Sequence, residues 1–313
     1  MNDKSLIVLA GPTAVGKTAL SINLAKALDA EIISADSVQV YKKLDIGSAK
    51  ITQEEMDGVT HHLIDVLEPD EDFNVALFKE MVKAAIDKVH ANGHVPILAG
   101  GTGFYIQAVL KDVDFSEGES DPEIRSRLEK EAEAIGNIAM HNRLAEIDPE
   151  SADSIPVGNL KRVIRALEYY EITGERISEH NATEKMKQSP YDYRFFVLND
   201  DRDKLYERID KRVDIMMRDG LLSEVTDLKN AGISRDAVSM QSLGYRQIMN
   251  YLYGEYSLEE AVYQIKLQTR HFAKRQLTWF KREKDTIWVN KPDFEYNEEK
   301  MLAFMIDKCK EIM

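Results

Sequence analysis

The chain has 313 residues, 43% of them hydrophobic, so it can bury a large core as one big domain or two smaller ones. Its formal net charge of −14 argues at first sight against a polyanionic partner, although such binding depends on where Lys and Arg cluster. Its apolar runs are too short for a signal peptide or a membrane span, and its single cysteine, Cys309, excludes an internal disulfide. We therefore expect a globular protein of the cytoplasm with no membrane partner.

The first predicted elements are a strand and a helix on either side of a glycine-rich loop. Residues 5–10, SLIVLA, form an apolar and β-branched run typical of a buried parallel strand. The apolar residues of TALSINLAKAL recur at helical spacing. Between them, GPTAVGKT has the spacing of a phosphate-binding loop. A glycine-rich turn without a ligand is the alternative, and the strand-loop-helix context disfavours it.

The loop spacing gives its residues distinct roles in holding an anion. Gly11 and Gly16 permit the positive-φ turns that direct the backbone N–H groups of residues 13–18, and the helix N-terminus, at a phosphate. Lys17 adds a full positive charge, and Thr18 offers a hydroxyl to Mg²⁺. The sequence thus predicts a bound di- or triphosphate with Mg²⁺ as cofactor. The phosphate-binding set is Gly11, Pro12, Thr13, Ala14, Val15, Gly16, Lys17 and Thr18.

Strands and helices continue to alternate after this loop. EIISA ends at Asp36, HHLIDVL follows, and VALFKEMVKAAIDKVH predicts a helix. VPILAGGTGFYIQAVL then predicts a strand, a second glycine-rich turn and a helix. This order indicates an α/β fold with a parallel sheet and ligands beyond the carboxyl ends of its strands.

A polar linker, KDVDFSEGESDPE, ends the alternation. From residue 121 to residue 189 the chain shows only helical periodicity, broken at DPES and IPVGN. Strand character returns with YRFFVLN, two long helices follow, and TIWVN is the last predicted strand. We predict a P-loop-containing α/β catalytic core of residues 1–118 and 190–313, with an inserted all-helical subdomain at residues 119–189.

Two acids near strand ends, Asp36 and Asp65, could hold the magnesium of a triphosphate-hydrolysing enzyme. Neither follows a strongly apolar strand of the usual length, and VPILAGG ends in glycines, which weakens the ATPase interpretation without excluding it. Ser37, Gln39 and Tyr41 provide hydrogen-bonding and stacking groups beside Asp36. That setting suits a carboxylate that accepts a proton from a substrate amine or hydroxyl. A surface turn is the alternative.

Two basic clusters stand out in the acidic chain. NLKRVIRALEYY carries Lys161, Arg162 and Arg165, and RHFAKRQLTWFKREK carries six Lys and Arg residues against the single acid Glu283. Interleaved apolar and aromatic residues indicate helices with a core face and a basic face. For either cluster alone, a solvated helix surface is an equally good interpretation.

With these stretches and others, the chain resembles the bacterial tRNA dimethylallyltransferases, also called tRNA isopentenyltransferases. Seven matching stretches run in order over nearly the whole chain: GPTAVGKTAL, ISADSVQVYKKLDIGSAK, HHLIDV, ILAGGTGFY, RVIRALEYYEITG, LGYRQ and RHFAKRQLTWFKR. The resemblance implies transfer of the dimethylallyl group from dimethylallyl pyrophosphate to the exocyclic N6 amine of the adenosine just 3′ of the anticodon in tRNA, with release of pyrophosphate. It also implies that the helical insertion grips the anticodon arm.

The resemblance further implies site roles. Asp36 is then the general base, because the adenine amine is a poor nucleophile and must lose a proton as the C–N bond forms. Lys17 and the loop stabilise the charge on the leaving pyrophosphate, and Thr102 lies near the reacting centre. An arginine of YERIDKR reaches the pyrophosphate, with Arg212 our first choice and Arg208 our second. The residues implied to contact tRNA are Asp36, Ser37, Val38, Gln39, Thr102, Arg125, Asn159, Lys161, Arg162, Val163, Arg246, Arg270, Lys274 and Arg275.

Two other functions share part of this pattern. A small-molecule or nucleotide kinase has the same loop and α/β order, but it has no use for the two basic helices. A noncatalytic, nucleotide-gated RNA-binding protein would bind RNA and turn over nothing. No self-complementary heptad seam is visible, so we expect a monomer.

Overall fold

The computed structural model describes residues 4–115 and 121–313 and divides the chain into two compact units. The first comprises Met1–Val109 and Tyr191–Met313, and the second comprises Leu110–Pro190. The second unit is thus an insertion in the first. The predicted boundary between residues 118 and 119 lies outside the described residues.

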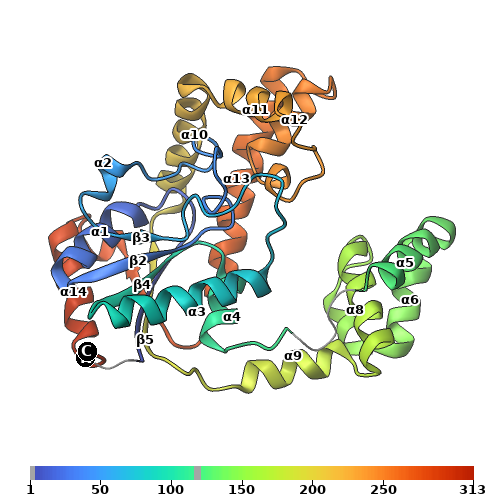
Figure 1. The fold of residues 1–313 in the computed structure, drawn as a ribbon, viewed down its shortest axis with the longest axis horizontal. Coiled ribbons are helices and arrows are strands. Elements are labelled where there is room, and N and C mark those ends of the chain that lie inside the picture. The colour runs from blue at the N-terminus through green and yellow to red at the C-terminus, as the bar shows by residue number, and fades with distance from the viewer. Residues whose placement is uncertain (1–3, 116–120) are drawn as a thin grey trace. The chain divides into compact units, whose positions relative to one another are not determined.

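A parallel sheet forms the centre of the first unit (Figure 1). Within the described ranges it has six strands in the order β3-β2-β4-β1-β5-β6, every neighbouring pair parallel. All residues of the two strands β1 and β2 are buried, as expected for strands covered on both faces. The predicted α/β class is confirmed, although HHLIDVL contributes only a two-residue strand. The strands are β1 (Ser5–Ala10), β2 (Ala30–Ala35), β3 (His61–His62), β4 (Val95–Gly100), β5 (Asp192–Asn199) and β6 (Thr286–Asn290).

Helices cover the two faces of this sheet. Helices α1 and α14 pack against each other on one face, while α3 covers β2 and β4 from the other (Figure 1). This placement follows from right-handed crossovers that run in opposite directions from β1 to β2 and from β3 to β4. The helices of this unit are α1 (Lys17–Leu28), α2 (Gln53–Met56), α3 (Val75–Ala91), α4 (Gly103–Leu110), α10 (Arg202–Asp219), α11 (Leu221–Asn230), α12 (Tyr245–Leu252), α13 (Leu258–Phe280) and α14 (Glu298–Cys309), with short 3-10 turns at Ser239–Gln241 and Lys291–Phe294.

The parallel arrangement brings the carboxyl ends of the strands to one edge of the sheet. Gly11, Asp36 and Gly101 directly follow β1, β2 and β4, which are neighbours in the sheet. At this edge the main chains approach closely, since a Cβ on Gly100 would lie 2.2 Å from the carbonyl oxygen of Ala35. The glycines that end β4 therefore have a packing reason, and the edge collects polar groups far apart in the sequence.

The described part of the second unit, residues 110–115 and 121–190, contains helices and no strand. Its core includes Leu128, Met140, Leu144 and Leu167. Asp148 caps α7 and accepts a second backbone hydrogen bond from Ser178, which explains the break predicted at DPES. The helices are α5 (Pro122–Ile135), α6 (Asn137–Ile147), α7 (Pro149–Ser154), α8 (Leu160–Thr173) and α9 (Ile177–Met186).

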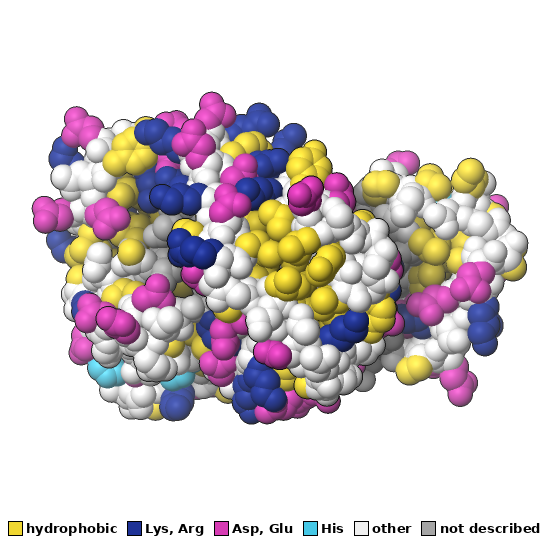
Figure 2. Space-filling model, turned by 90° about the horizontal axis from the view of Figure 1, so that it is seen from above, with side chains coloured by type: hydrophobic (Ala, Val, Ile, Leu, Met, Phe, Trp, Pro, Cys, Tyr) yellow, Lys and Arg dark blue, Asp and Glu magenta, His cyan; other side chains and the backbone are white. Residues whose placement is uncertain are grey.

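Among the helices of the described residues, none is both long and apolar enough to cross a bilayer. On the face drawn in Figure 2, Lys and Arg side chains lie among Asp and Glu side chains, beside a group of exposed hydrophobic ones. The net charge of the chain is therefore a poor guide to any local surface.

Candidate active site

The loop between β1 and α1 has the backbone of an anion cradle. Gly16 caps α1 with φ of 95°, and Ala14 also lies in the left-handed region at 62°. Gly16 has no side chain with which to cap the helix, so it leaves the first N–H groups of α1 without a capping hydrogen bond from this position. These groups and the helix dipole favour a negatively charged ligand at this point.

Lys17 lies folded into this loop. Its Nζ donates hydrogen bonds to the carbonyl oxygens of Gly11 and Pro12, both at 2.9 Å. Burial and the positive charge of Arg212 lower the pKa of Lys17 from 10.5 to about 8, against an opposing effect of Asp36. An anion bound in the loop would stabilise the charged form of Lys17 and raise its pKa again.

The lowered pKa predicts a pH dependence of anion binding. The free protein loses the Lys17 charge as the pH passes about 8, whereas bound diphosphate favours the charged form. We therefore expect the dissociation constant for inorganic pyrophosphate to rise above this pH, with proton uptake on binding. Calorimetry in buffers of different ionisation enthalpy measures that uptake. A Lys17→Arg variant keeps its charge and should bind with less pH dependence between about pH 7 and 9; equal dependence in both proteins would contradict the assignment.

Asp36 follows β2 and is held by its own turn. Its Oδ1 accepts hydrogen bonds from the backbone N–H groups of Val38 at 2.8 Å and Gln39 at 3.2 Å. Its Oδ2 accepts none from the residues that the structure describes. One oxygen thus fixes the carboxylate, and the other is available to a substrate proton. Asp65, the other acid considered from sequence, is instead ion-paired with Lys50 at 2.5 Å.

The structure separates the two candidate arginines of α10. Arg208 donates through Nε to the carbonyl oxygen of Ala14 at 3.0 Å and is ion-paired with the buried carboxylate of Asp200. Arg212 has no such partner within the described ranges, and its side chain lines the cavity beside the loop. Arg208 therefore supports the loop from outside, while Arg212 can reach a bound anion.

The phosphate loop, Asp36 and Arg212 line one cavity of about 460 Å³. Its wall also includes hydrophobic side chains of Ile209, Val213, Met216, Leu243, Ile265 and Phe272. The arrangement combines an anion cradle, a carboxylate and an apolar wall in one space. The sequence-predicted residues that line it are Thr13, Ala14, Gly16, Lys17, Thr18, Asp36, Ser37, Val38, Gln39, Thr102, Arg212, Arg246 and Arg275.

Other predicted residues lie elsewhere. Gly11, Pro12 and Val15 are buried in the loop and do not line the cavity. Arg270 does not line the cavity; its Nη1 contacts both carboxylate oxygens of Asp210, at 2.5 and 2.7 Å. Lys274 lies in a separate shallow groove along α13, which also contains Arg275 and Trp279.

In the helical unit, the predicted tRNA contacts differ in availability. Lys161 and Arg162 are exposed on α8, and Asn159 is the residue just before that helix. Arg125 is ion-paired with the buried Glu168 at 2.6 Å. Val163 is 0% exposed in the unit's core, so its side chain does not reach the surface, and the predicted RNA contact at this position would have to come from the backbone. The helical period that exposes residues 161 and 162 turns residue 163 inward.

Two site residues escaped the sequence reasoning. Gln276 accepts a hydrogen bond from the Thr13 N–H and donates one to the Gly101 carbonyl, both at 3.0 Å. It thereby ties the phosphate loop to the second glycine-rich turn, and it occupies one N–H that the sequence had assigned to the anion. Lys291 follows β6, and its Nζ lies 2.9 Å from the place a Cβ on Gly16 would take. The sequence could have indicated Lys291, because it directly follows a predicted parallel strand, where ligand-binding residues are expected.

The residues of the cavity fit a magnesium ion that arrives with a diphosphate. Thr18 lines the cavity, and its hydroxyl offers an oxygen ligand, the type that Mg²⁺ prefers. The described residues contain no cluster of three His, Cys, Asp or Glu side chains that could hold a metal by itself. Mg²⁺ commonly takes one or two protein oxygens, with substrate phosphates and water as its other ligands.

The fold and this site define a P-loop α/β protein whose cavity combines an anion cradle with an apolar wall. The chain belongs to the IPP transferase family, whose model matches residues 39–283. The family resemblance seen in the sequence is thus confirmed.

Individual relatives agree with this assignment. The chain is 58% identical over 289 residues to a tRNA dimethylallyltransferase of Lachnoclostridium phytofermentans, covering 92% of each protein. It is similar to the crystal structure of the full-length tRNA isopentenylpyrophosphate transferase of Bacillus halodurans, with 42% identity, a TM-score of 0.74 and coverage of 98% and 97%. A eukaryotic dimethylallyltransferase acting on tRNA gives a TM-score of 0.77 at 30% identity, covering 92% of this chain and 74% of that one.

Proposed function

We propose that this chain transfers the dimethylallyl group of dimethylallyl pyrophosphate to the N6 amine of the adenosine just 3′ of the anticodon in tRNA. One observation carries the proposal: Lys17, Asp36 and Arg212 line a single cavity whose wall is partly hydrophobic. A cradle for diphosphate, a proton acceptor and a place for an apolar five-carbon group are the parts that this reaction needs. The relatives are named as dimethylallyltransferases acting on tRNA, which does not favour the kinase alternative.

The chemistry follows from these positions. The allylic C–O bond breaks, and its electron pair goes to the diphosphate, which leaves with the charge. The loop N–H groups, Lys17 and Arg212 stabilise that charge as it develops. The amine nitrogen forms the new C–N bond, and its proton passes to Oδ2 of Asp36. Mg²⁺, held by Thr18 and the diphosphate, would add further positive charge at the leaving group.

Basic residues of each unit would bind the RNA. Bases of an anticodon loop are single-stranded, so extruding one into a cavity costs less than extruding a paired base. Thr102 and Ser37–Gln39, which line the cavity, would contact the extruded nucleotide. Lys161 and Arg162 are exposed and can contact phosphates.

Phosphate contacts predict a salt-dependent affinity for tRNA. Replacing Lys161 and Arg162 with Ala should weaken binding and reduce the slope of log affinity against log salt by about one for each lost contact. Titrations of unmodified tRNA at several salt concentrations measure the slope. Lys310→Ala, which changes an exposed residue after α14, serves as a control with the wild-type slope. A slope unchanged by the double substitution would remove α8 from the RNA interface.

The function itself is tested by mass. The protein is incubated with dimethylallyl pyrophosphate, Mg²⁺ and unmodified tRNA, and the RNA is then weighed. A gain of one C₅H₈ unit on the adenosine beside the anticodon is expected. In a parallel incubation with ATP, a phosphorylated product would indicate a kinase, and RNA that binds but is unchanged in both incubations would indicate a binding protein. We place the reaction in the cytoplasm and expect a monomer, which sedimentation measures directly.

A further inference from the structure

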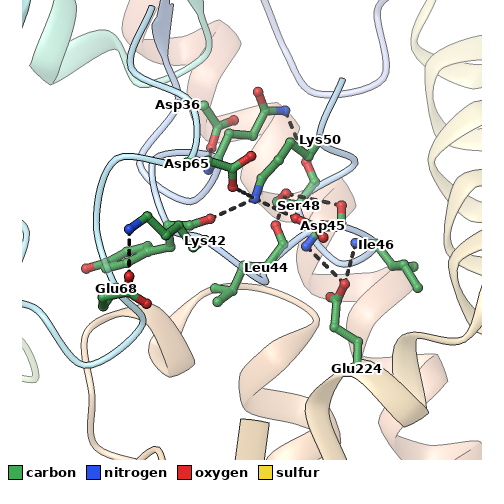
Figure 3. Close-up of polar contacts among 12 residues, drawn as sticks. Asp36, Lys42, Leu44, Asp45, Ile46, Ser48, Lys50, Asp65, Glu68 and Glu224 are labelled. Atoms are coloured by element: carbon green, nitrogen blue, oxygen red, sulfur yellow. Dashed lines mark hydrogen bonds and ion pairs between the residues drawn. The ribbon is translucent and has the colours of Figure 1, made fainter. Parts of the chain in front are cut away.

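The loop of residues 45–49 forms one wall of the cavity, and a carboxylate from a distant helix binds its backbone. Gly47, Ser48 and Ala49 of this loop line the cavity. Glu224, on α11, accepts hydrogen bonds from the backbone N–H groups of Asp45 at 2.9 Å and Ile46 at 2.7 Å (Figure 3). It also accepts one from the next N–H along the chain, that of Gly47, at 3.1 Å. A carboxylate that accepts several N–H bonds forms strong, charge-assisted contacts.

Tyr245 completes the contact from the helix side. Its buried hydroxyl donates to Glu224 Oε1 at 2.6 Å. Burial and the charge of Glu224 raise the pKa of Tyr245 far above its ordinary value, so the phenol stays a donor at any physiological pH. The Tyr245 ring also packs on the loop so closely that a Cβ on Gly47 would lie 2.5 Å from it. The glycine at 47 therefore lets the loop reach Glu224.

The same loop is bonded to the turn that carries Asp36. Gln39 Nε2 donates to the carbonyl oxygens of Ser48 at 3.3 Å and Ala49 at 3.2 Å. The Gln39 N–H in turn donates to Asp36 Oδ1 at 3.2 Å. A continuous chain of hydrogen bonds thus runs from Glu224 through the 45–49 loop to the carboxylate of Asp36.

Lys50, just after the loop, also binds the first residue of the loop. The ammonium group of Lys50, with a side chain 5% exposed, bridges Asp45 at 2.6 Å and Asp65 at 2.5 Å (Figure 3). It also donates to the carbonyl oxygen of Tyr41 at 2.7 Å. Lys50 therefore ties the loop to Asp65 and to the backbone of Tyr41. Glu224 ties the loop to α11 through the backbone N–H groups of residues 45–47.

We propose that Glu224 is a positioning residue for the transfer reaction: it holds the 45–49 loop, and through Gln39 it keeps the Asp36 carboxylate aimed at the substrate amine. This inference rests on the proposed function. Glu224 touches neither diphosphate loop nor general base, so its loss should alter the geometry of proton transfer and leave the anion cradle intact. Misplacement of a reacting group by about 1 Å can cost about 100-fold in rate.

The test compares substitutions at position 224 at a temperature where every variant is folded. We expect Glu224→Ala to lower kcat by about 10- to 100-fold, with KM for dimethylallyl pyrophosphate changed by no more than about twofold. Glu224→Gln keeps one acceptor oxygen for the loop, so its loss should be smaller. Hydrogen exchange should quicken in peptides covering residues 39–49 and stay unchanged in those covering the phosphate loop.

Glu31→Ala provides the matched control. Glu31 is also a buried carboxylate, bonded to His62 at 2.5 Å and Asn92 at 3.0 Å, but it lies toward the amino end of β2, away from the cavity. Equal kcat in Glu31→Ala and Glu224→Ala would overturn the positioning role. If Glu224→Ala does not fold, Gly47→Ala displaces the same loop by steric conflict and should give the same loss of kcat; wild-type kcat there would also overturn it.

The proposed function and this inference fail in different ways. A wild-type protein that leaves tRNA unchanged refutes the proposed function. The role of Glu224 alone is refuted if the wild-type protein is active, the Glu224→Ala variant is as active as the Glu31→Ala control, and hydrogen exchange in residues 39–49 is unaltered. Non-additive losses of kcat in the Glu224→Ala, Gly47→Ala double mutant would support a shared route to Asp36.

Discussion

Replacing Asp36 with Asn is expected to lower the single-turnover rate of dimethylallyl transfer by about 10²- to 10⁴-fold. An amide at this position keeps an oxygen that can accept the Val38 and Gln39 N–H bonds, so the turn is retained. The amide cannot accept the proton that the adenine amine must lose. Rapid quenching of enzyme with bound tRNA and excess dimethylallyl pyrophosphate measures this step without product release.

Binding measurements separate chemistry from folding in this variant. The affinity for tRNA should change little, because a phosphate-dominated interface does not depend on one carboxylate. Asp36→Ala removes the turn acceptor as well and should be at least as slow. A single-turnover rate for Asp36→Asn within about threefold of wild type would show that another group takes the proton.

Replacing Arg212 with Ala should have the second-largest effect, a loss of about 10²- to 10³-fold in kcat, typical for removal of one donor to a developing oxyanion. Arg212 lines the cavity with no ion-pair partner among the residues described, and burial lowers its pKa. A partly buried cation without an ion-pair partner gains most when a diphosphate bears its full charge. Arg212→Lys should recover part of the rate, since the charge remains but the planar fork is lost.

Arg208→Ala is the informative comparison. This substitution leaves the buried Asp200 carboxylate without its guanidinium and frees the Ala14 carbonyl, so we expect a lower melting temperature and a smaller loss of kcat. Steady-state kinetics and thermal unfolding of both variants distinguish the two roles. The assignment would fall if Arg208→Ala slowed catalysis more than Arg212→Ala while folded.

The sequence was most informative where the chemistry is local. GPTAVGKT specifies the phosphate loop because its glycines, lysine and threonine act through neighbouring backbone groups. Asp36 could be picked out for the same reason, since its turn is formed with the next three residues. Strand and helix order also follows from short-range periodicity, and it determined the α/β class and the helical insertion.

The tertiary structure decided what depends on pairing between distant segments. Periodicity could not show that Arg208 is occupied by Asp200 and Arg212 is not, because both lie on one face of α10. Gln276 meets Thr13 across 263 positions, and Glu224 meets the 45–49 loop across nearly 180, so no local pattern marks either contact. The sequence by itself determined the anion cradle and singled out Asp36 as a candidate base, because short stretches of chain build both features alone. The structure decided which side chains surround and hold them, because that is set by the packing of a parallel sheet and its helices.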